Sequence, residues 1–264
     1  MRFSVVTATF NRRTLLPRAL NSALEFVRIV GDGEVVVIDD ASHDGTVDMI
    51  RTVYAAQIEA GLLKLVERDA NGGSAVAKSD GARQASGDWL VILDSDDELL
   101  HDAAALIPDF INSHSDEKLF FFRCIDQSDR LIGPPKPPTR LSFRELLTEG
   151  TPGECLPVIS RLACLEFPSD GDASGYEFMS MLRIARAYGY AMVSNSIVRR
   201  YYVDSANRLS SRAGNLRRAY QHVNGNQRML REFGSIMSFR RRLGLVIRIF
   251  CYGAVCKIGR GKLK

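Results

Sequence analysis

The residues with the clearest chemical potential are the carboxylates of segment 93–98, which reads Leu-Asp-Ser-Asp-Asp-Glu. Carboxylates packed this closely repel one another, so they need a compensating positive charge. Asp94 and Asp96 form an Asp-x-Asp pair, and such hard oxygen ligands suit Mg²⁺ or Mn²⁺, with diphosphate oxygens of a ligand completing the shell. A solvated acidic loop that caps the next helix is the alternative that the residue types leave open.

A second acidic pair, Asp39 and Asp40, ends an apolar run at 34–38. If both acidic segments follow strands of one parallel sheet, they converge on the same edge, where such sheets bind ligands. Asp39 or Asp40 could then accept a hydrogen bond from a ribose or a base. Asp44 is better suited to cap the following helix, and capping is also the alternative for the pair.

The elements that must position these carboxylates alternate along the first hundred residues. Short β-rich runs predict strands at 3–9, 34–38, 63–67 and 89–93, and the intervening patterns predict helices at 14–26, 44–60 and 74–85. Strands alternating with helices of this length predict βαβ units. We therefore expect an α/β fold with a central, mostly parallel sheet flanked by helices.

The pattern is looser after residue 100. We expect a helix at 103–113, a strand at 119–124 in the same sheet, helices at 143–148 and 175–187, and a strand at 190–198. The segment 133–138 contains four prolines, which remove backbone donors and fix φ, so it is a loop. From about residue 213 the chain is predicted to be helical to its end.

Four blocks in the first hundred residues stand in a characteristic order and spacing: 4–12, 37–46, 71–88 and 93–97. A fifth, at 176–185, is similar to an acidic-aromatic motif at the head of a helix. With these blocks the chain resembles the family 2 glycosyltransferases, which have the Rossmann-like GT-A fold. The resemblance implies a GT-A catalytic domain at 1–212, with a nucleotide-binding half at 1–100 and an acceptor-binding half at 101–212, followed by a helical region at 213–264.

The resemblance also implies roles for individual residues. Lys78 stands where the family usually carries arginine, so it would face the diphosphate as a point charge and not as a bidentate fork. Nucleotide-sugar binding would involve Thr7, Thr9, Asn11, Asp39, Asp40, Lys78, Asp94 and Ser95, and Mn²⁺ or Mg²⁺ would be held by Asp94, Asp96 and Asp97.

The catalytic base is implied in the same way. Inverting transfer needs a carboxylate that deprotonates the acceptor hydroxyl. Alignment of the 182–185 segment with the family helix places Glu177 at this position, where the family more often has aspartate. Asp172, in the preceding loop, is the competing candidate. Alternatively, Glu177 is a first-turn helix residue favoured by the helix macrodipole.

One family element is missing. Members often carry Tyr-Arg-x-His after the last strand, whereas this chain reads Arg-Arg-Tyr-Tyr-Val-Asp from Arg199 and has no histidine there. Arg200 or Arg208 could supply positive charge near the leaving group, or both could be surface residues. The four histidines show no metal-ligand spacing, so no role is assigned to them.

Charge is distributed unevenly along the 264 residues. The net charge is +4 (35 basic minus 31 acidic residues), yet the C-terminal tail, 240–264, holds eight basic residues and no acidic one, which leaves 27 minus 31, or −4, for the rest. A chain-wide nucleic-acid function is therefore excluded. The tail is apolar between its basic residues and too short and charged to span a bilayer, so it suits an anionic membrane surface. Packing on the domain and a homo-oligomer contact are the alternatives.

The resemblance implies a metal-dependent inverting glycosyltransferase that moves a sugar from a nucleotide sugar, UDP-linked, to a glycan or lipid-linked acceptor in cell-surface polysaccharide biosynthesis. Five cysteines without metal-site spacing predict reduced thiols and a cytoplasmic enzyme, peripheral on the inner face of the membrane. A non-enzymatic binding module is one alternative, and a nucleotidyltransferase such as a nucleotide-sugar pyrophosphorylase is the other. That class requires a glycine-rich loop after the first strand, where segment 9–13 has no glycine.

Overall fold

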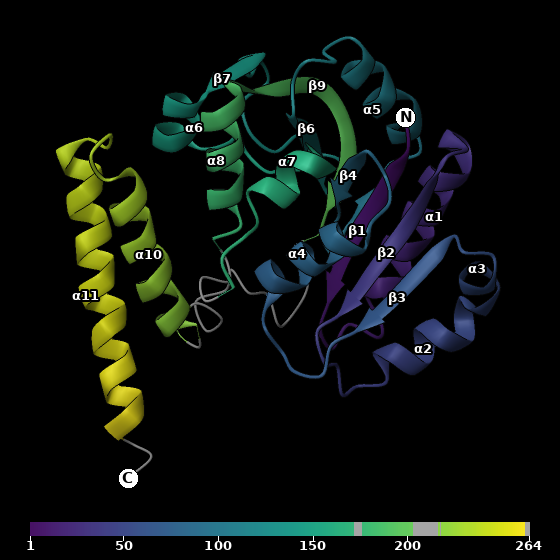
Figure 1. Cartoon of the computed structure of the whole chain (residues 1–264), viewed down its shortest axis with the longest axis horizontal. Coiled ribbons are helices and arrows are strands. Elements are labelled where there is room, and N and C mark those ends of the chain that lie inside the picture. Colours follow the sequence, from purple (N-terminus) through teal and green to yellow (C-terminus); the bar gives the residue numbers. More distant parts are fainter. Residues whose placement is uncertain (172–175, 203–215, 217, 262–264) are drawn as a thin grey trace.

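A nine-stranded mixed sheet is the centre of the computed structural model (Figure 1). The model describes all residues except 172–175, 203–215, 217 and 262–264, with side chains up to residue 256. The strands are β1 (Phe3–Thr9), β2 (Gly33–Asp39), β3 (Leu63–Glu67), β4 (Trp89–Ile92), β5 (Glu98–Leu99), β6 (Leu119–Asp126), β7 (Arg140–Ser142), β8 (Cys155–Ser160) and β9 (Tyr190–Tyr201).

The strand order is β3-β2-β1-β4-β8-β6-β9-β5, and β7 pairs with β9. The first four strands are parallel, as predicted. Beyond β4 the sheet is mixed, because β8 runs antiparallel to both β4 and β6, whereas β6 and β9 are parallel. The parallel half therefore presents the carboxyl ends of β1, β2 and β4 at one edge.

Helices cover both faces of the sheet. They are α1 (Leu16–Val30), α2 (Thr46–Val53), α3 (Ala55–Glu59), α4 (Ser74–Gln84), α5 (Ala103–Asn112), α6 (Phe143–Glu149), α7 (Arg161–Glu166), α8 (Phe178–Tyr188), α10 (Ala219–Phe233) and α11 (Phe239–Gly261). One core lies between the sheet and α1, α2 and α5, and the other between the sheet and α4, α6, α7, α8 and α10. Alternate residues of each strand enter opposite cores, as Val5 and Val6 do.

Local sequence explains several element ends. Pro17 lies in the first turn of α1, where its missing N–H is not needed, and Gly31 ends the helix with a φ of +81°. Ser142 and Glu145 form a reciprocal capping box at the start of α6. Gly81 lets α4 lie directly on β1, because a Cβ there would overlap the side chain of Val6. This close packing fixes the N-terminal half of α4 beside the carboxyl edge of the sheet.

Most predicted elements are confirmed to within a few residues, and the α/β fold with a helical C-terminal segment is confirmed. The helix predicted at 44–60 is instead two helices that meet at Tyr54, whose φ of −110° is not helical. Tyr54 is buried and its hydroxyl donates to Asn21 on α1, so tertiary packing overrides the local helical pattern here. The sequence did not indicate β5, β7, β8 or α7.

The two C-terminal helices form a hairpin (α10 and α11) at one side of the molecule, with α11 outermost (Figure 1). The Arg183 guanidinium on α8 makes a two-pronged contact with Glu232 on α10, at 2.8 and 2.7 Å. Asp170 accepts from Arg183 at 2.7 Å and from Arg228 at 3.1 Å. Side chains of α10 and α11 also enter the second core, so the hairpin packs on the domain.

Two further findings concern the chain as a whole. Among the residues that the model describes, no helix is long and apolar enough to cross a membrane. All five cysteines lie in the described part, and each is a free thiol.

Candidate active site

The loops that follow β1 and β2 are joined at the carboxyl edge of the sheet. Asn11 adopts a φ of +52°, a left-handed conformation that asparagine tolerates. Its backbone N–H donates to Ser42 Oγ, and its side-chain oxygen accepts from the backbone N–H of His43, both at 2.8 Å. The predicted nucleotide contact Asn11 therefore shapes this edge by clamping the two loops together.

The neighbouring carboxylates Asp39 and Asp40 have different surroundings. Asp40 accepts from the backbone N–H groups of Gly72 and Gly73 at 2.9 and 2.7 Å and pairs with Arg68 at 3.1 Å. It thereby fixes the loop that starts α4. Asp39 is 1% exposed; its Oδ2 accepts from the Ser42 N–H at 2.8 Å, but its buried Oδ1 has no hydrogen-bond partner among the described residues. Asp39 thus retains a hydrogen-bond acceptor, whereas Asp40 is committed to the protein.

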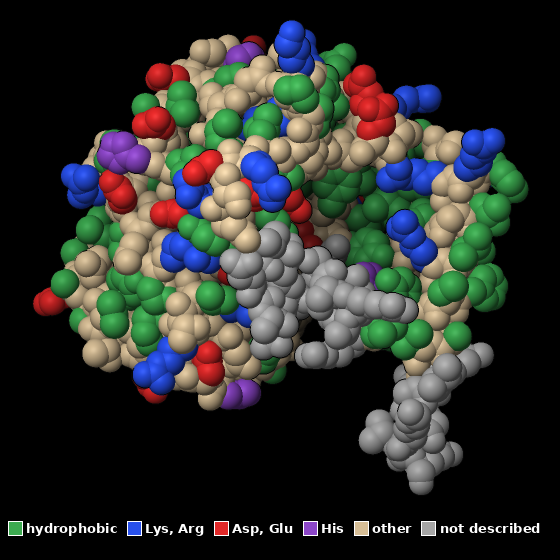
Figure 2. Space-filling view, turned by 180° about the vertical axis from the view of Figure 1, so that it is seen from behind, with side chains coloured by type: hydrophobic (Ala, Val, Ile, Leu, Met, Phe, Trp, Pro, Cys, Tyr) green, Lys and Arg blue, Asp and Glu red, His purple; other side chains and the backbone are tan. Residues whose placement is uncertain are grey.

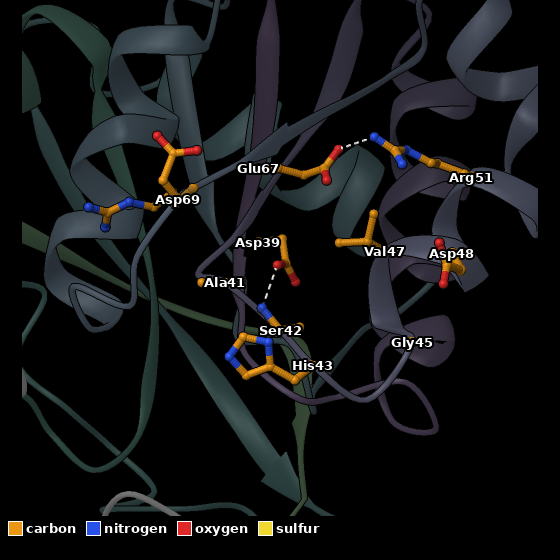
Figure 3. A pocket seen from close by; sticks show the side chains of 11 residues that line it. Asp39, Ala41, Ser42, His43, Gly45, Val47, Asp48, Arg51, Glu67 and Asp69 are labelled. Atoms are coloured by element: carbon orange, nitrogen blue, oxygen red, sulfur yellow. Dashed lines mark hydrogen bonds and ion pairs between the residues drawn. The ribbon is translucent and has the colours of Figure 1, made fainter.

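A pocket of about 450 Å³ opens beside Asp39 (Figure 3). In the figure the Asp39 carboxylate lies near the centre, and Glu67 at the end of β3 pairs with Arg51 of α2 at 2.5 Å. The lining is polar on most sides and consists of Asp39, Ala41, Ser42, His43, Gly45, Val47, Asp48, Arg51, Glu67, Arg68 and Asp69. Its size and its hydrogen-bonding groups suit a small heterocycle with a sugar attached.

Two basic side chains from different elements contact the acidic loop, residues 93–97. Lys78 of α4 donates to Asp94 at 2.8 Å. Arg199 of β9 lies 3.8 Å from Asp94 and 3.3 Å from Asp97, and a further 3.4 Å contact joins it to Glu154. Burial alone would raise the pKa of Asp94, but Lys78 and Arg199 outweigh it and lower that pKa. The predicted compensating charge is therefore present.

The three aspartates of the loop differ in accessibility. Asp97 is fully buried against Arg199 and accepts from the backbone N–H of Tyr202 at 3.1 Å. Burial raises the pKa of Asp97, with the nearby charge of Asp94 adding to the effect. The Asp94 side chain is 44% exposed. Asp96 is partly exposed, and its carboxylate has no partner among the described residues. Asp94 and Asp96 therefore face outward, whereas Asp97 faces the protein.

The loop backbone is held from α1 and β9. Arg18 donates to the carbonyl of Asp96, and its guanidinium carbon lies 3.4 Å from the centre of the Tyr202 ring. The Tyr202 hydroxyl in turn donates to Glu98 at 3.0 Å. These contacts fix the loop at a point where three elements meet.

The sequence did not single out Arg199. Arg200, which we considered as a source of positive charge, pairs with Asp129 at 2.8 Å and lies 3.9 Å from Glu98, away from the Asp94 carboxylate. The second candidate, Arg208, lies outside the described residues. Successive residues of a strand point to opposite faces, so Arg199 and Arg200 must diverge, but only the observed strand pairing shows which one meets the acidic loop.

Glu177, the predicted base, immediately precedes α8 and accepts a hydrogen bond from the hydroxyl of Ser74, the first residue of α4. Its charge also reaches Lys78, whose pKa is raised by Asp94 and Glu177 although burial opposes this. Glu177 is thus brought to the same edge as Lys78 and Asp94, across 103 residues of sequence from Ser74. The competing base Asp172 lies outside the described residues.

The remaining predicted donor contacts are buried. Thr7 and Thr9 project from β1, and neither hydroxyl oxygen has a hydrogen-bond partner among the described residues. Ser95 is 8% exposed within the acidic loop. The structure therefore brings these three residues to the same sheet edge as Asp39 and Asp94.

The carboxylate oxygens at this edge fit a divalent cation held by two protein side chains. No group of three or more His, Cys, Asp or Glu side chains that could hold a metal occurs in the part of the chain that the model describes. Asp94 and Asp96 nevertheless offer partly exposed oxygen ligands, and Mg²⁺ or Mn²⁺ commonly takes only one or two carboxylates, with phosphate oxygens and water as the other ligands.

Comparison with known proteins identifies the family to which this chain belongs. The family model described as "Glycosyl transferase family 2" matches residues 4–147, more than half of the chain. This chain belongs to glycosyl transferase family 2. The membership confirms the resemblance read from the blocks between residues 4 and 97.

Curated relatives and solved structures are also similar to this chain. A "PGL/p-HBAD biosynthesis glycosyltransferase" of Mycobacterium bovis is 32% identical over 120 residues, which are 45% of each chain. The similarity thus spans less than half the length of such curated relatives. S. aureus TarS 1–349 in complex with UDP-GlcNAc has a TM-score of 0.67 at 16% identity, covering 96% of this family 2 chain and 72% of TarS 1–349.

A mannosyltransferase of Pyrobaculum calidifontis, in complex with GDP-Man and Mn²⁺, has a TM-score of 0.64 at 19% identity. The similarity covers 98% of this chain and 75% of the mannosyltransferase chain. Similarity at this level of identity establishes the shared GT-A fold. The family 2 chain therefore has the architecture of nucleotide-sugar-dependent transferases, with its acidic loop at the carboxyl edge of the parallel half.

Proposed function

We propose that this family 2 member is an inverting glycosyltransferase that moves a sugar from a UDP-sugar to a glycan or lipid-linked acceptor. The observation that carries the proposal is the convergence of Asp39, the acidic loop, Lys78 and Glu177 on one sheet edge. A donor bound there would have its base in the pocket beside Asp39, its diphosphate near Lys78 and its sugar towards Glu177.

The choice of a uridine donor rests on Asp39. Its buried Oδ1 has no partner among the described residues, and a buried acceptor without a donor is costly, by about 1–3 kcal/mol. The N3–H of uracil would satisfy it. That TarS 1–349 was solved with UDP-GlcNAc on a similar fold supports this choice. We assign Asp40 to holding the α4 loop and not to the base.

Asp94 and Asp96 are the proposed ligands of Mn²⁺ or Mg²⁺. When bound, the cation would neutralise the negative charge that develops on the leaving diphosphate. Asp97, which the family resemblance implied as an equally possible ligand, is better suited to anchoring the loop because it is fully buried and paired with Arg199. Solved GT-A neighbours that contain Mn²⁺ support metal use.

Glu177 is the proposed base. The acceptor oxygen would attack the anomeric carbon, the bond from that carbon to the diphosphate oxygen would break with its electron pair, and the acceptor proton would pass to the Glu177 carboxylate. The Ser74 hydroxyl holds that carboxylate in place, and the Lys78 ammonium provides positive charge on the diphosphate side. Lys78 would exchange Asp94 for the diphosphate as the donor binds.

The acceptor and the place of action complete the proposal. We assign donor binding to residues 1–100, acceptor binding to 101–212, and placement at the inner face of the membrane, near a lipid-linked acceptor of cell-surface polysaccharide synthesis, to 213–264. The basic, acid-free C-terminal tail supports the last assignment.

The test is donor turnover across a panel of UDP- and GDP-sugars, with and without Mn²⁺. We expect turnover of a UDP-sugar that requires the cation. Asp96→Asn should lower it more than tenfold, and Glu177→Gln should abolish sugar transfer while UDP binding by calorimetry persists. Asp116→Asn, at an exposed carboxylate before β6, is the matched control and should behave as the wild type. Inactivity with every donor, or full activity of Asp96→Asn, would refute the proposal.

A further inference from the structure

Helix α11 has two opposite apolar faces: one packs on the domain, and the other is exposed among the residues that the structure describes. Leu245 is 8% exposed and belongs to the second core, so its side of the helix faces the domain. Phe239, Leu243, Ile247 and Phe250 are 70%, 46%, 53% and 73% exposed. We name these four residues the outer stripe. A packed helix normally directs polar residues to solvent, so this second apolar face needs an explanation.

The outer stripe is a continuous surface. Its members follow the i, i+4, i+8, i+11 spacing, which places them along one side of an α-helix. Figure 2 shows hydrophobic side chains along the outer edge of the hairpin, together with Lys and Arg side chains, on the part of the molecule farthest from the sheet. Because α11 is the outermost element, a flat surface could meet the stripe without touching the catalytic domain.

The charges that border the stripe identify its partner. Arg240 and Arg242 are exposed on the two flanks of the stripe, and no acidic residue occurs from Arg240 onward. Arg241 is directed to the domain instead, where it donates to the carbonyl of Thr148. An apolar strip bordered by cations and free of carboxylates complements a bilayer that bears anionic headgroups.

We infer that the outer stripe of α11 docks the protein onto an anionic membrane, with the helix lying in the headgroup plane and the catalytic domain held above it by α10. This goes beyond the proposed placement of the tail, because it names the side of the helix that enters the lipid. It rests on the proposed function only for where the acceptor lies.

The test is sedimentation of the full chain with vesicles of phosphatidylcholine alone or with phosphatidylglycerol added. We expect binding to the anionic vesicles only. The double variant Ile247→Glu/Phe250→Glu should lower it at least tenfold. Leu162→Glu is the matched control, because Leu162 on α7 is 74% exposed but lies outside the stripe. Replacing Arg240 and Arg242 by glutamine should lower binding roughly 25-fold, since each basic residue contributes about fivefold.

Two further measurements keep the outcomes distinct. Circular dichroism melting and UDP binding of each variant show that the fold and donor site are intact. Analytical ultracentrifugation without vesicles tests whether a second copy covers the stripe: a wild-type dimer that the double variant dissociates, with vesicle binding unchanged, would overturn the inference. A wild-type protein that does not bind anionic vesicles would also overturn the inference. Vesicle binding that depends on the stripe, in a chain that turns over no donor, would refute the proposed activity and leave the docking intact.

Discussion

At the scale of single residues, the buried guanidinium of Arg199 balances carboxylates that would otherwise repel one another. It is 3% exposed and lies within 4 Å of Asp94, Asp97 and Glu154, and its Nε donates to the thiol of Cys124 at 3.1 Å. Burial would lower its pKa, yet these neighbours raise it. Arg199 therefore stays charged and holds the acidic loop in position from the protein interior.

Replacing Arg199 by lysine tests this role. Lysine keeps the charge but cannot reach several carboxylates with a planar fork, so we expect the free energy of unfolding to fall by about 1.5–3 kcal/mol. Donor turnover should fall roughly tenfold or more, because the loop that carries Asp94 and Asp96 loses its support. Chemical denaturation and turnover assays measure the two effects. Arg200→Lys, on the opposite face of β9, is the control and should change turnover little; equal losses in both variants would contradict the assignment.

Asp39 and Asp40 should respond oppositely to the same substitution. Asp40→Asn weakens the contacts to Gly72, Gly73 and Arg68, so it should lower the unfolding free energy by about 1–3 kcal/mol. Asp39→Asn should leave stability nearly unchanged but weaken UDP binding at least tenfold, because the amide cannot accept as strongly at Oδ1. Denaturation and calorimetry with UDP distinguish the two. Loss of UDP affinity only in Asp40→Asn would show that the base binds elsewhere.

The sequence could place this acidic pair but could not divide its roles. Both aspartates end one strand, and residue types reveal neither which side chain lies beside the pocket nor which one captures the α4 loop. The same limit applies to Asp97 beside Asp96. Strand alternation settles such choices only once neighbouring strands and loops are placed.

At the scale of elements, the parallel half of the sheet was predictable because β1, β2 and β4 are buried, largely apolar runs, and helices of ordinary length separate them from one another and from the short β-rich run of β3. The second half was not. Strand β8 is six residues long and contains Pro157, and it inserts antiparallel between β4 and β6, which are distant in sequence. Its pairing depends on long-range contacts and leaves no local pattern.

The Glu34 carboxylate links β1, β2 and the turn before β4 through hydrogen bonds. From these bonds we expect the protein to lose stability in acid. Burial would raise its pKa, but hydrogen bonds from the backbone and hydroxyl of Ser86 and from Ser4 outweigh this, and the pKa is lowered below 4.5. The stabilisation is therefore complete above pH 4.5 and is lost as the pH falls through the folded-state pKa.

Glu34→Gln should thus lower the unfolding free energy at pH 7 by about 1–3 kcal/mol, and the difference from wild type should shrink below pH 4.5. Urea denaturation at a series of pH values measures it. Glu149→Gln, at the exposed end of α6, is the control. A difference between wild type and Glu34→Gln that grows towards low pH would contradict the expected sign.

At the scale of the whole molecule, the uneven charge corresponds to two surfaces with different tasks. The body, with a net charge of −4, holds the carboxylates of the site, and the basic tail forms most of α11. The charge split was visible in the sequence. What the sequence left open was whether the tail packs on the domain or faces outward, and the structure shows both, on opposite sides of one helix.

Because α10 and α11 share a core with the domain, we expect body and hairpin to unfold together. Phe233 on α10 is fully buried, and its ring centre lies 5.6 Å from that of Phe143 on α6. Phe233→Ala should remove about 3–5 kcal/mol of stability from a single cooperative transition. Phe250→Ala, which removes a ring of the outer stripe, should leave that transition almost unchanged.

Differential scanning calorimetry of the full chain, with far-ultraviolet and near-ultraviolet circular dichroism recorded over the same temperatures, measures this coupling. Coincident transitions that shift together in Phe233→Ala would mean that the hairpin and the domain unfold as one unit. A loss of stability in the hairpin would then also destabilise the acidic loop and its surroundings. A separate low-temperature transition that alone responds to Phe233→Ala would mean that the hairpin detaches first. In that case membrane docking by α11 would tether the catalytic domain without orienting it.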